Sequence, residues 1–192
     1  MMPRRHRPGL PEFLRRFLRG EDAAVSVEFI LAMPMLFWAF AACFVFFDGY
    51  RQSTINLRAA YTISDMISRE TAGIDSTYID SMQRLLALMA RSGSDTALRV
   101  TILRWEDDAG RHYVDWSASR GFPGAITNTT AATMTGRLPL MSDGERIILV
   151  ETSNTYTPVF KVGIGPRKLQ NFVFTRPRFA PWIAWVGPRP GG

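Results

Sequence analysis

The stretch AAVSVEFILAMPMLFWAFAACFVFF, residues 23–47, decides how this chain folds. It contains a single charged residue, Glu28, and otherwise only Ser26 is polar. As an α-helix that rises about 1.5 Å per residue, the stretch would reach roughly 37 Å, enough to cross a hydrocarbon core of about 30 Å with some tilt. A buried core helix is the alternative, but such helices rarely run this long with bulky apolar residues on every side. The stretch therefore predicts a single transmembrane helix.

The composition of the whole chain conceals this segment. The chain has 192 residues and a formal net charge of +6, and its mean hydropathy of −0.03 is typical of a soluble protein. One cysteine excludes an intramolecular disulfide framework, and two histidines leave little for a metal site built from His and Cys. The neutral mean hydropathy therefore averages an apolar helix with a polar remainder.

The residues before the apolar stretch indicate its orientation. Six arginines precede it, against three acidic residues, and the nearest arginines are Arg15, Arg16 and Arg19. Lys and Arg are enriched in cytoplasmic flanks, so residues 1–22 are predicted to form a basic cytoplasmic arm, and residues from 48 onward to lie in the periplasm of a bacterial cell. Because topology explains this dense basic cluster, we expect no nucleic-acid partner.

A cleaved signal peptide is a second explanation for an apolar segment near the N-terminus. Its apolar region would be about 7–15 residues long and would be followed by small residues. Here the run continues past Ala39 and Ala41 into CFVFF, residues 43–47. We therefore expect the segment to stay attached as an inner-membrane anchor.

Glu28 is the most informative residue of the stretch. An ionisable side chain within a membrane span is energetically costly and is usually retained for a specific partner. Close to the cytoplasmic interface, however, water reaches a carboxylate and reduces this cost. Both interpretations fit the position of Glu28 near the start of the stretch.

The residues around this glutamate resemble the N-terminal signature of a known family. The run DAAVSVEF, residues 22–29, ends in Phe29 and is followed by Pro34. This pattern is similar to that of TadE-like proteins, which are minor pseudopilins of the tight-adherence (Tad/Flp, type IVc) pilus machinery. Looser similarity to the same family extends beyond the stretch, at residues 48–60, 114–117, 151–160 and 175–179.

The resemblance implies a role for Glu28 in subunit assembly. A prepilin peptidase would cut between Ala23 and Ala24, although the residue before the cut is commonly glycine in such proteins. The carboxylate of Glu28 would then meet the N-terminal amine of a neighbouring subunit and select the register of the two helices. The implied partners are the inner membrane, the prepilin peptidase and other pilins, pseudopilins or pilus assembly proteins.

Residues 48–186 are predicted to form a periplasmic α+β domain. No Gly or Pro occurs between Tyr50 and Ala72, so the membrane helix is expected to continue outward as an amphipathic helix to about residue 69, with Gly49 as a candidate weak point. Its partners are a second helix, capped by Asp75 or Ser76, and several strands: helix 77–90, and strands 98–105, 112–117, 147–152, 153–162 and 172–174. These elements predict a helical rod packed on one face of a small, mostly antiparallel sheet.

Two further expectations concern the end of the chain and the edge of the sheet. Pro158 favours an edge position for the strand at 153–162, because proline cannot donate to a β-ladder. Trp182, Ile183 and Trp185 are expected to pack on the domain or on a partner. Residues 187–192 are expected to form a disordered tail.

No motif of this sequence carries enzymatic chemistry. A nucleophile elbow, a P-loop and a dinucleotide fingerprint are all absent from it. His112 is the only histidine outside the basic arm and lies beside a hairpin turn, where an exposed polar residue is the ordinary case. The acidic turn 106–108 with Asp115 offers oxygen ligands for a hard cation such as Ca²⁺, but its spacing does not fit an EF-hand, so a solvated turn is favoured. We therefore expect neither enzymatic activity nor a cofactor.

The favoured hypothesis is a single-pass protein of the bacterial inner membrane with a cytoplasmic N terminus. The resemblance implies that it acts as a TadE-like minor pseudopilin or assembly component of a type IVc (Tad/Flp) pilus, a cell-adhesion structure, either in the membrane or within the filament. The alternative is a signal-anchored periplasmic binding or structural module unrelated to pili. The lack of nucleophile motifs disfavours a membrane-anchored hydrolase.

Overall fold

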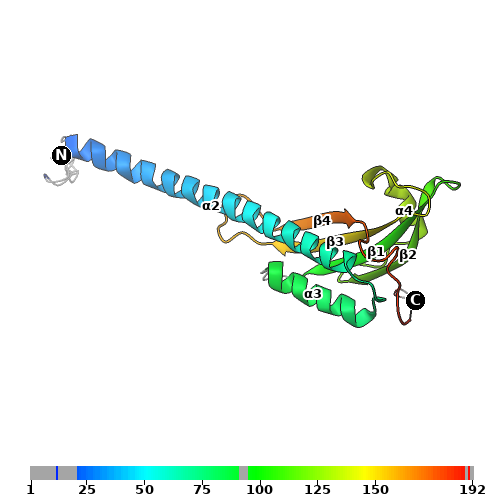
Figure 1. Cartoon of the computed structure of the whole chain (residues 1–192). Helices are drawn as coiled ribbons and strands as arrows, with labels where there is room; N and C mark the ends of the chain where they lie inside the picture. The colour runs from blue at the N-terminus through cyan, green and yellow to red at the C-terminus, as the bar shows by residue number, and fades with distance from the viewer. Residues whose placement is uncertain (1–11, 13–20, 91–94, 189, 191–192) are drawn as a thin grey trace, which may run out of the picture.

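The computed structural model describes residues 12, 21–90, 95–188 and 190, with the backbone alone for residues 21–24. One long helix projects from a small α+β domain, and its N-terminal half stands clear of the rest (Figure 1). The helices are α2 (Glu21–Ser68), α3 (Ser76–Ala90), α4 (Asn128–Thr133) and the 3₁₀ helix η1 (Thr135–Arg137). The strands are β1 (Ala97–Glu106), β2 (Arg111–Arg120), β3 (Arg146–Tyr156) and β4 (Arg167–Thr175). This architecture confirms the predicted fold class.

The four strands form one antiparallel sheet in the order β2-β1-β3-β4. β1 and β2 form the predicted hairpin, in which Glu106 pairs with Arg111 across a turn that places Gly110 at a φ of 58°. A positive φ strains residues that have a Cβ, so glycine suits this position. The register shifts after Ile102, where a bulge accommodates one extra residue of β2.

The third strand corrects the prediction of separate strands at residues 147–152 and 153–162. These segments form one strand, β3, that ends at Tyr156. β3 is central in the sheet and pairs with β1 on one side and with β4 on the other. Pro158 lies in the loop beyond its end, where the missing N–H leaves no gap in either ladder.

The last strand is longer than the predicted segment 172–174. β4 begins at Arg167, and its first half, RKLQN, is largely polar. This half lacks a regular apolar alternation, so its strand conformation follows from pairing with β3, for example of Gln170 with Ser153. β4 forms one edge of the sheet.

The helices α2 and α3 cover one face of the sheet (Figure 1). The second half of α2 buries Ala59, Ile63 and Ile67, which recur at every fourth position and therefore share one side of the helix. They form one apolar cluster with residues of α3 and of the sheet: Ile79, Met82, Leu86, Leu98, Val100, Ile102, Ile148 and Val150. The predicted packing of the helical rod on one face of the sheet is confirmed.

A smaller apolar cluster lies on the opposite face of the sheet. Ile126 and Ala131, from α4 and the loop before it, pack with Leu103, Ile147 and Leu149. The sheet is therefore covered on both faces at this end, which explains why Arg146, the first residue of β3, is followed by a run of consecutive apolar residues.

The C-terminal segment packs on the domain, one of the two placements expected for it. The N–H of Ile74 donates to the carbonyl of Ala184 (2.8 Å), and the N–H of Val186 donates to the carbonyl of Ile74 (2.9 Å). Ile183 is buried, and its carbonyl accepts a hydrogen bond from the indole Nε1 of Trp116 (2.8 Å). These contacts tie the end of the chain to the loop between α2 and α3.

Candidate membrane anchor and its junction with the domain

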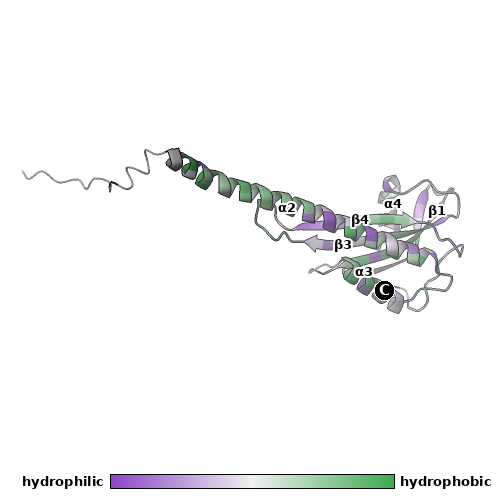
Figure 2. Ribbon diagram, turned by 60° about the vertical axis from the view of Figure 1, so that its left-hand side comes forward, coloured by the Kyte–Doolittle hydropathy of each residue, from purple (hydrophilic) through white to green (hydrophobic). Residues whose placement is uncertain are grey.

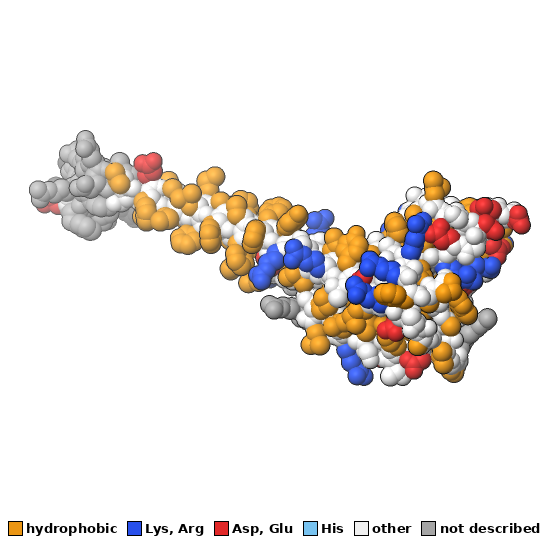
Figure 3. Space-filling model, viewed as in Figure 1, with side chains coloured by type: hydrophobic (Ala, Val, Ile, Leu, Met, Phe, Trp, Pro, Cys, Tyr) orange, Lys and Arg blue, Asp and Glu red, His pale blue; other side chains and the backbone are white. Residues whose placement is uncertain are grey.

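The N-terminal half of α2 is apolar and uncovered. Among the described residues, α2 is the one helix long and apolar enough to cross a membrane, and 6% of its most apolar window is buried. Figure 2 shows this half as a continuous hydrophobic segment, and Figure 3 shows hydrophobic side chains along it. Its large exposed apolar side chains are Val25, Val27, Phe29, Ile30, Leu31, Met35, Leu36, Phe37, Trp38, Phe40 and Phe44. Such a helix is compatible with a single transmembrane span or a signal anchor.

The environment of α2 changes near Val45 while the helix continues. Val45 is the first buried side chain among those described in α2. Neither Pro34 nor Gly49 ends the helix, which runs for 48 residues. At about 1.5 Å per residue it is roughly 72 Å long, more than twice the thickness of a hydrocarbon core. One continuous helix thus supplies both the apolar segment and a core element of the domain.

Tyr156, at the end of β3, fastens the sheet to α2 at this transition. Its hydroxyl donates toward the carbonyl of Val45 (3.2 Å) and the carboxylate of Asp48 (3.0 Å). Its ring lies against Gly49, where a Cβ would be 3.3 Å from Cε1 of the tyrosine. Burial, the hydrogen bond to Asp48 and the charge of Asp48 raise the pKa of Tyr156, so the phenol keeps its proton. Because Gly49 has no side chain, the ring of Tyr156 can approach α2 closely, and the helix continues through this glycine without a break.

A buried pair of polar side chains also joins α2 to the sheet, about two turns further along the helix. Asn56 donates from Nδ2 to Oδ1 of Asn154 on β3 (2.7 Å), and both side chains are buried. Gln52 donates to the carbonyl of Ala90 at the end of α3 (2.6 Å). These bonds join α2 to β3 and to α3, so they fix the rotation of α2 about its own axis relative to the domain.

The residues of the predicted helix signature, Glu28, Phe29 and Pro34, lie in the uncovered half of α2. Glu28 is exposed, and none of the ion pairs between described residues involves it. The carboxylate is thus available to a partner outside the described chain.

The predicted cleavage residues and the arginines that predict the topology have no described side chains. The structure describes only the helical backbone of Ala23 and Ala24. The arginines that predict the topology, Arg15, Arg16 and Arg19, lie outside the described residues.

The acidic turn at 106–108 interacts with its own neighbours. Glu106 pairs with Arg104 (2.6 Å), and Asp107 accepts a hydrogen bond from the indole of Trp105. Asp115 of β2 pairs with Arg146 (2.7 Å). In the part of the chain that the structure describes, no group of three or more His, Cys, Asp or Glu side chains is arranged to hold a metal ion.

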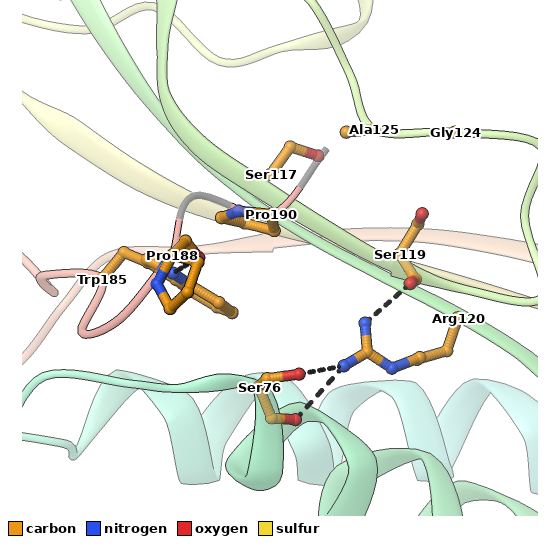
Figure 4. A pocket seen from close by; sticks show the side chains of 9 residues that line it. All are labelled: Ser76, Ser117, Ser119, Arg120, Gly124, Ala125, Trp185, Pro188 and Pro190. Carbon is orange, nitrogen blue, oxygen red and sulfur yellow. Dashed lines mark hydrogen bonds between the residues drawn. The ribbon is translucent and has the colours of Figure 1, made fainter. Parts of the chain in front are cut away.

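A hollow of about 360 Å³ lies between the start of α3, β2 and the C-terminal segment (Figure 4). Arg120 is the charged residue in its lining, and its guanidinium donates to the carboxylate of Asp80 (2.5 Å) and to the hydroxyl of Ser76 (2.6 Å). The hydroxyl of Ser117, also in the lining, lies 2.8 Å from that of Thr101 and accepts from a backbone N–H. Arg120 and Ser117 of the lining therefore already have hydrogen-bond partners within the chain.

His112 is buried, so the expectation of an exposed residue is wrong. Its ring lies edge-on to that of Trp105, its partner across the hairpin, with 4.7 Å between the ring centroids. Neither ring nitrogen has a hydrogen-bond partner among the described residues, so His112 forms no Ser–His pair there. Burial lowers the pKa of His112, because the imidazolium form would lose its hydration.

We expect the domain to lose stability as the pH falls below about 6.5. Because the pKa of His112 is lower in the folded chain, the unfolded chain binds more protons in this range. The contribution of His112 is constant above the unfolded pKa, declines below it by at most about 1.4 kcal/mol per pH unit, and levels off below the folded pKa. Urea unfolding of the wild type and of His112→Leu across this range measures the difference. An identical pH dependence of the two chains would contradict this assignment.

Three features meet at the same end of the domain: the uncovered half of α2, the tyrosine that binds it to β3, and the buried amide pair. The sequence indicated only the first, because the other two join residues 108 and 98 positions apart. No family model, curated protein or solved structure matches the chain.

Proposed function

We propose that this chain is a single-pass inner-membrane protein that acts as a minor pseudopilin or assembly component of a Tad/Flp (type IVc) pilus. The observation that carries the proposal is the uncovered apolar half of α2, which continues without a break into the core of the domain. The resemblance of residues 22–29 and Pro34 to TadE-like proteins supports the pilus assignment. The arginines of the basic arm favour an orientation in which this arm is cytoplasmic and the domain is periplasmic.

Glu28 is the residue to which the proposal gives a specific role. In lipid or in the core of a filament, an unpaired carboxylate is costly and requires a partner of opposite charge. A cut before Ala24 creates an ammonium group about one helical turn from Glu28. The same ammonium group of a neighbouring subunit supplies the matching charge, so pairing favours one register between adjacent helices.

The continuity of α2 transmits this register to the periplasm. A shift along the apolar half of α2 moves the second half with it, because no break in the helix separates them. The bonds of Asn56 and Tyr156 tie that second half to the sheet. The subunit register that Glu28 selects in the membrane therefore positions the domain outside it.

The proposal assigns the chain a structural role without catalysis. In this proposal the buried imidazole of His112 and the paired guanidinium of Arg120 belong to the packing of the domain. The second candidate, a signal-anchored periplasmic binding module unrelated to pili, is favoured by the hollow beside Arg120. Normal pili in a strain that lacks the chain would favour this second candidate.

Mass spectrometry of the N terminus tests the processing step. In cells that contain the prepilin peptidase, the mature chain is expected to begin at Ala24, whereas cells without the peptidase should retain the basic arm. An intact arm in both strains would remove the cleavage and its new ammonium group from the proposal.

The variant Glu28→Gln is expected to lower the number of surface pili at least about tenfold, while the amount of chain in the membrane stays normal. Breaking a buried charge pair costs about 3–5 kcal/mol, which corresponds to more than about a hundredfold in the pairing equilibrium. Asp108→Asn is the matched control, because it removes one exposed carboxylate from the domain. Electron microscopy counts the pili, and unchanged piliation in Glu28→Gln would show that Glu28 sets no register.

A further inference from the structure

The loop between β3 and β4, residues 157–166, runs alongside α2 toward the N-terminus of the helix (Figures 1 and 2). Within this loop, the ring of Phe160 lies edge-on to that of Phe44, with 5.8 Å between the ring centroids. Phe44 belongs to the apolar half of α2 and precedes Asp48 by about one helical turn. The loop therefore reaches a residue of the candidate membrane span.

The loop presents two adjacent apolar side chains at this point. Val159 is 71% exposed and Phe160 is 47% exposed. Isolated apolar side chains are common on protein surfaces, but these two adjoin the exposed apolar surface of α2 through the contact with Phe44. Together they extend the apolar surface of the helix sideways onto the domain.

Four exposed cations, here called the junction cations, lie on this loop or on the two elements beside it, α2 and β4. Arg51 follows the apolar stretch on α2, Lys161 lies in the loop, and Arg167 and Lys168 begin β4. Arg167 is the ladder partner of Tyr156, the residue that contacts α2, so the start of β4 lies close to the helix. None of the ion pairs between described residues involves a junction cation.

A group of exposed acidic residues lies at the opposite end of the domain. Asp107 and Asp108 occupy the β1–β2 turn, and the side chain of Asp143 accepts from the backbone N–H of Asp107 (3.0 Å). Figure 3 shows acidic side chains at the end of the domain that lies far from the N-terminal half of α2. Anionic phosphates would attract the junction end of the domain and repel this far end.

We propose that the β3–β4 loop is a second membrane contact, in which Val159 and Phe160 enter the acyl-chain boundary and the junction cations bind phosphates of anionic phospholipids in the periplasmic leaflet. This inference rests on the proposed membrane anchor. Once α2 spans the bilayer, the contact with Phe44 holds Phe160 at the depth of the last turn of the span. Interfacial segments bury their apolar side chains about 5–10 Å into this boundary. Two attachment points then fix the tilt of the domain relative to the membrane.

Site-specific fluorescence of the full-length chain in lipid vesicles tests this contact. Cys43→Ala removes the single native cysteine. An NBD label is then attached at Val159→Cys or, as a matched control, at Leu140→Cys, a position 98% exposed. The vesicles contain phosphatidylcholine, phosphatidylglycerol and a phospholipid with a doxyl quencher close to its headgroup. We expect quenching about threefold stronger at residue 159 than at residue 140, because only the first label lies in the interface.

A second set of measurements tests the role of charge. The triple variant Lys161→Gln/Arg167→Gln/Lys168→Gln is expected to weaken the quenching at residue 159. Omitting phosphatidylglycerol from vesicles with the unmodified cations is expected to do the same. Quenching that is independent of both changes would overturn the phosphate contact.

The outcomes separate this inference from the anchor on which it rests. A chain that alkaline carbonate removes from the vesicles would overturn the anchor and the loop contact together. A chain that is retained with equal quenching at residues 159 and 140 would overturn the loop contact alone. Shielding of residue 159 from aqueous iodide, without lipid quenching and lost when the chain is diluted in the vesicles, would assign the loop to a second copy of the chain instead.

Discussion

The double variant Leu36→Arg/Phe40→Arg is expected to lose its attachment to the membrane. Both side chains lie near the middle of the apolar half of α2, one turn apart on the same side, and are 62% and 71% exposed. An arginine at the centre of a span costs about 2.5–3.5 kcal/mol on insertion, so the pair lowers the insertion equilibrium by roughly four orders of magnitude. After alkaline carbonate extraction, the wild type should stay in the membrane pellet and the variant should appear in the supernatant.

A second double variant separates loss of the span from a general effect of added charge. Leu88→Arg/Leu140→Arg places the same two charges on the domain, at positions 75% and 98% exposed, and should stay in the pellet. Near-ultraviolet circular dichroism reports whether the domain of each variant is folded. Retention of Leu36→Arg/Phe40→Arg in the pellet, at the level of the control, would show that α2 does not cross the membrane.

The features that depend on residues close together in the sequence could be predicted from it. The apolar half of α2 is recognisable because its many consecutive apolar residues contribute to one local signal. The start of α3 follows from its cap, since the carboxylate of Asp75 accepts a hydrogen bond from the N–H of Tyr78 (2.8 Å). The β1–β2 hairpin follows from a polar turn that places Gly110 between two β-prone segments.

The junction could not be predicted, because its contacts join distant segments. Asn56 and Asn154 are ordinary polar residues of their own segments, and only the fold brings their side chains within 2.7 Å. Gly49 has the local character of a weak point, yet its missing side chain serves the approach of Tyr156. His112 follows a turn, where exposure is the usual case, but pairing across the hairpin places its ring beside that of Trp105.

The contacts between α2 and the sheet give the two halves of this helix different surroundings. Its first half needs a lipid or protein surface around it, because its large apolar side chains are exposed on every side. Its second half gains its stability from the sheet, through one buried stripe of apolar residues. We therefore expect the same substitution to have different effects on the stability of the domain in the two halves of α2.

The variant Ile63→Ala is expected to lower the free energy of unfolding of the domain by about 2–5 kcal/mol. Ile63 is fully buried in the cluster between α2, α3 and the sheet, so its truncation leaves a cavity that the surrounding side chains fill only in part. Guanidinium chloride unfolding of the full-length chain in detergent micelles, followed by tryptophan fluorescence, measures the loss.

Ile30→Ala is the matched control, since it removes the same atoms from the same helix at a position 66% exposed. Detergent covers the side chain of Ile30, which does not belong to the core of the domain. The free energy of unfolding of the domain should therefore change by less than about 0.5 kcal/mol. A loss of equal size in the two variants would mean that the stability of the domain depends on the whole length of α2. A loss confined to Ile63→Ala would show that the domain folds on the second half, which leaves the first half to meet the membrane or a neighbouring subunit.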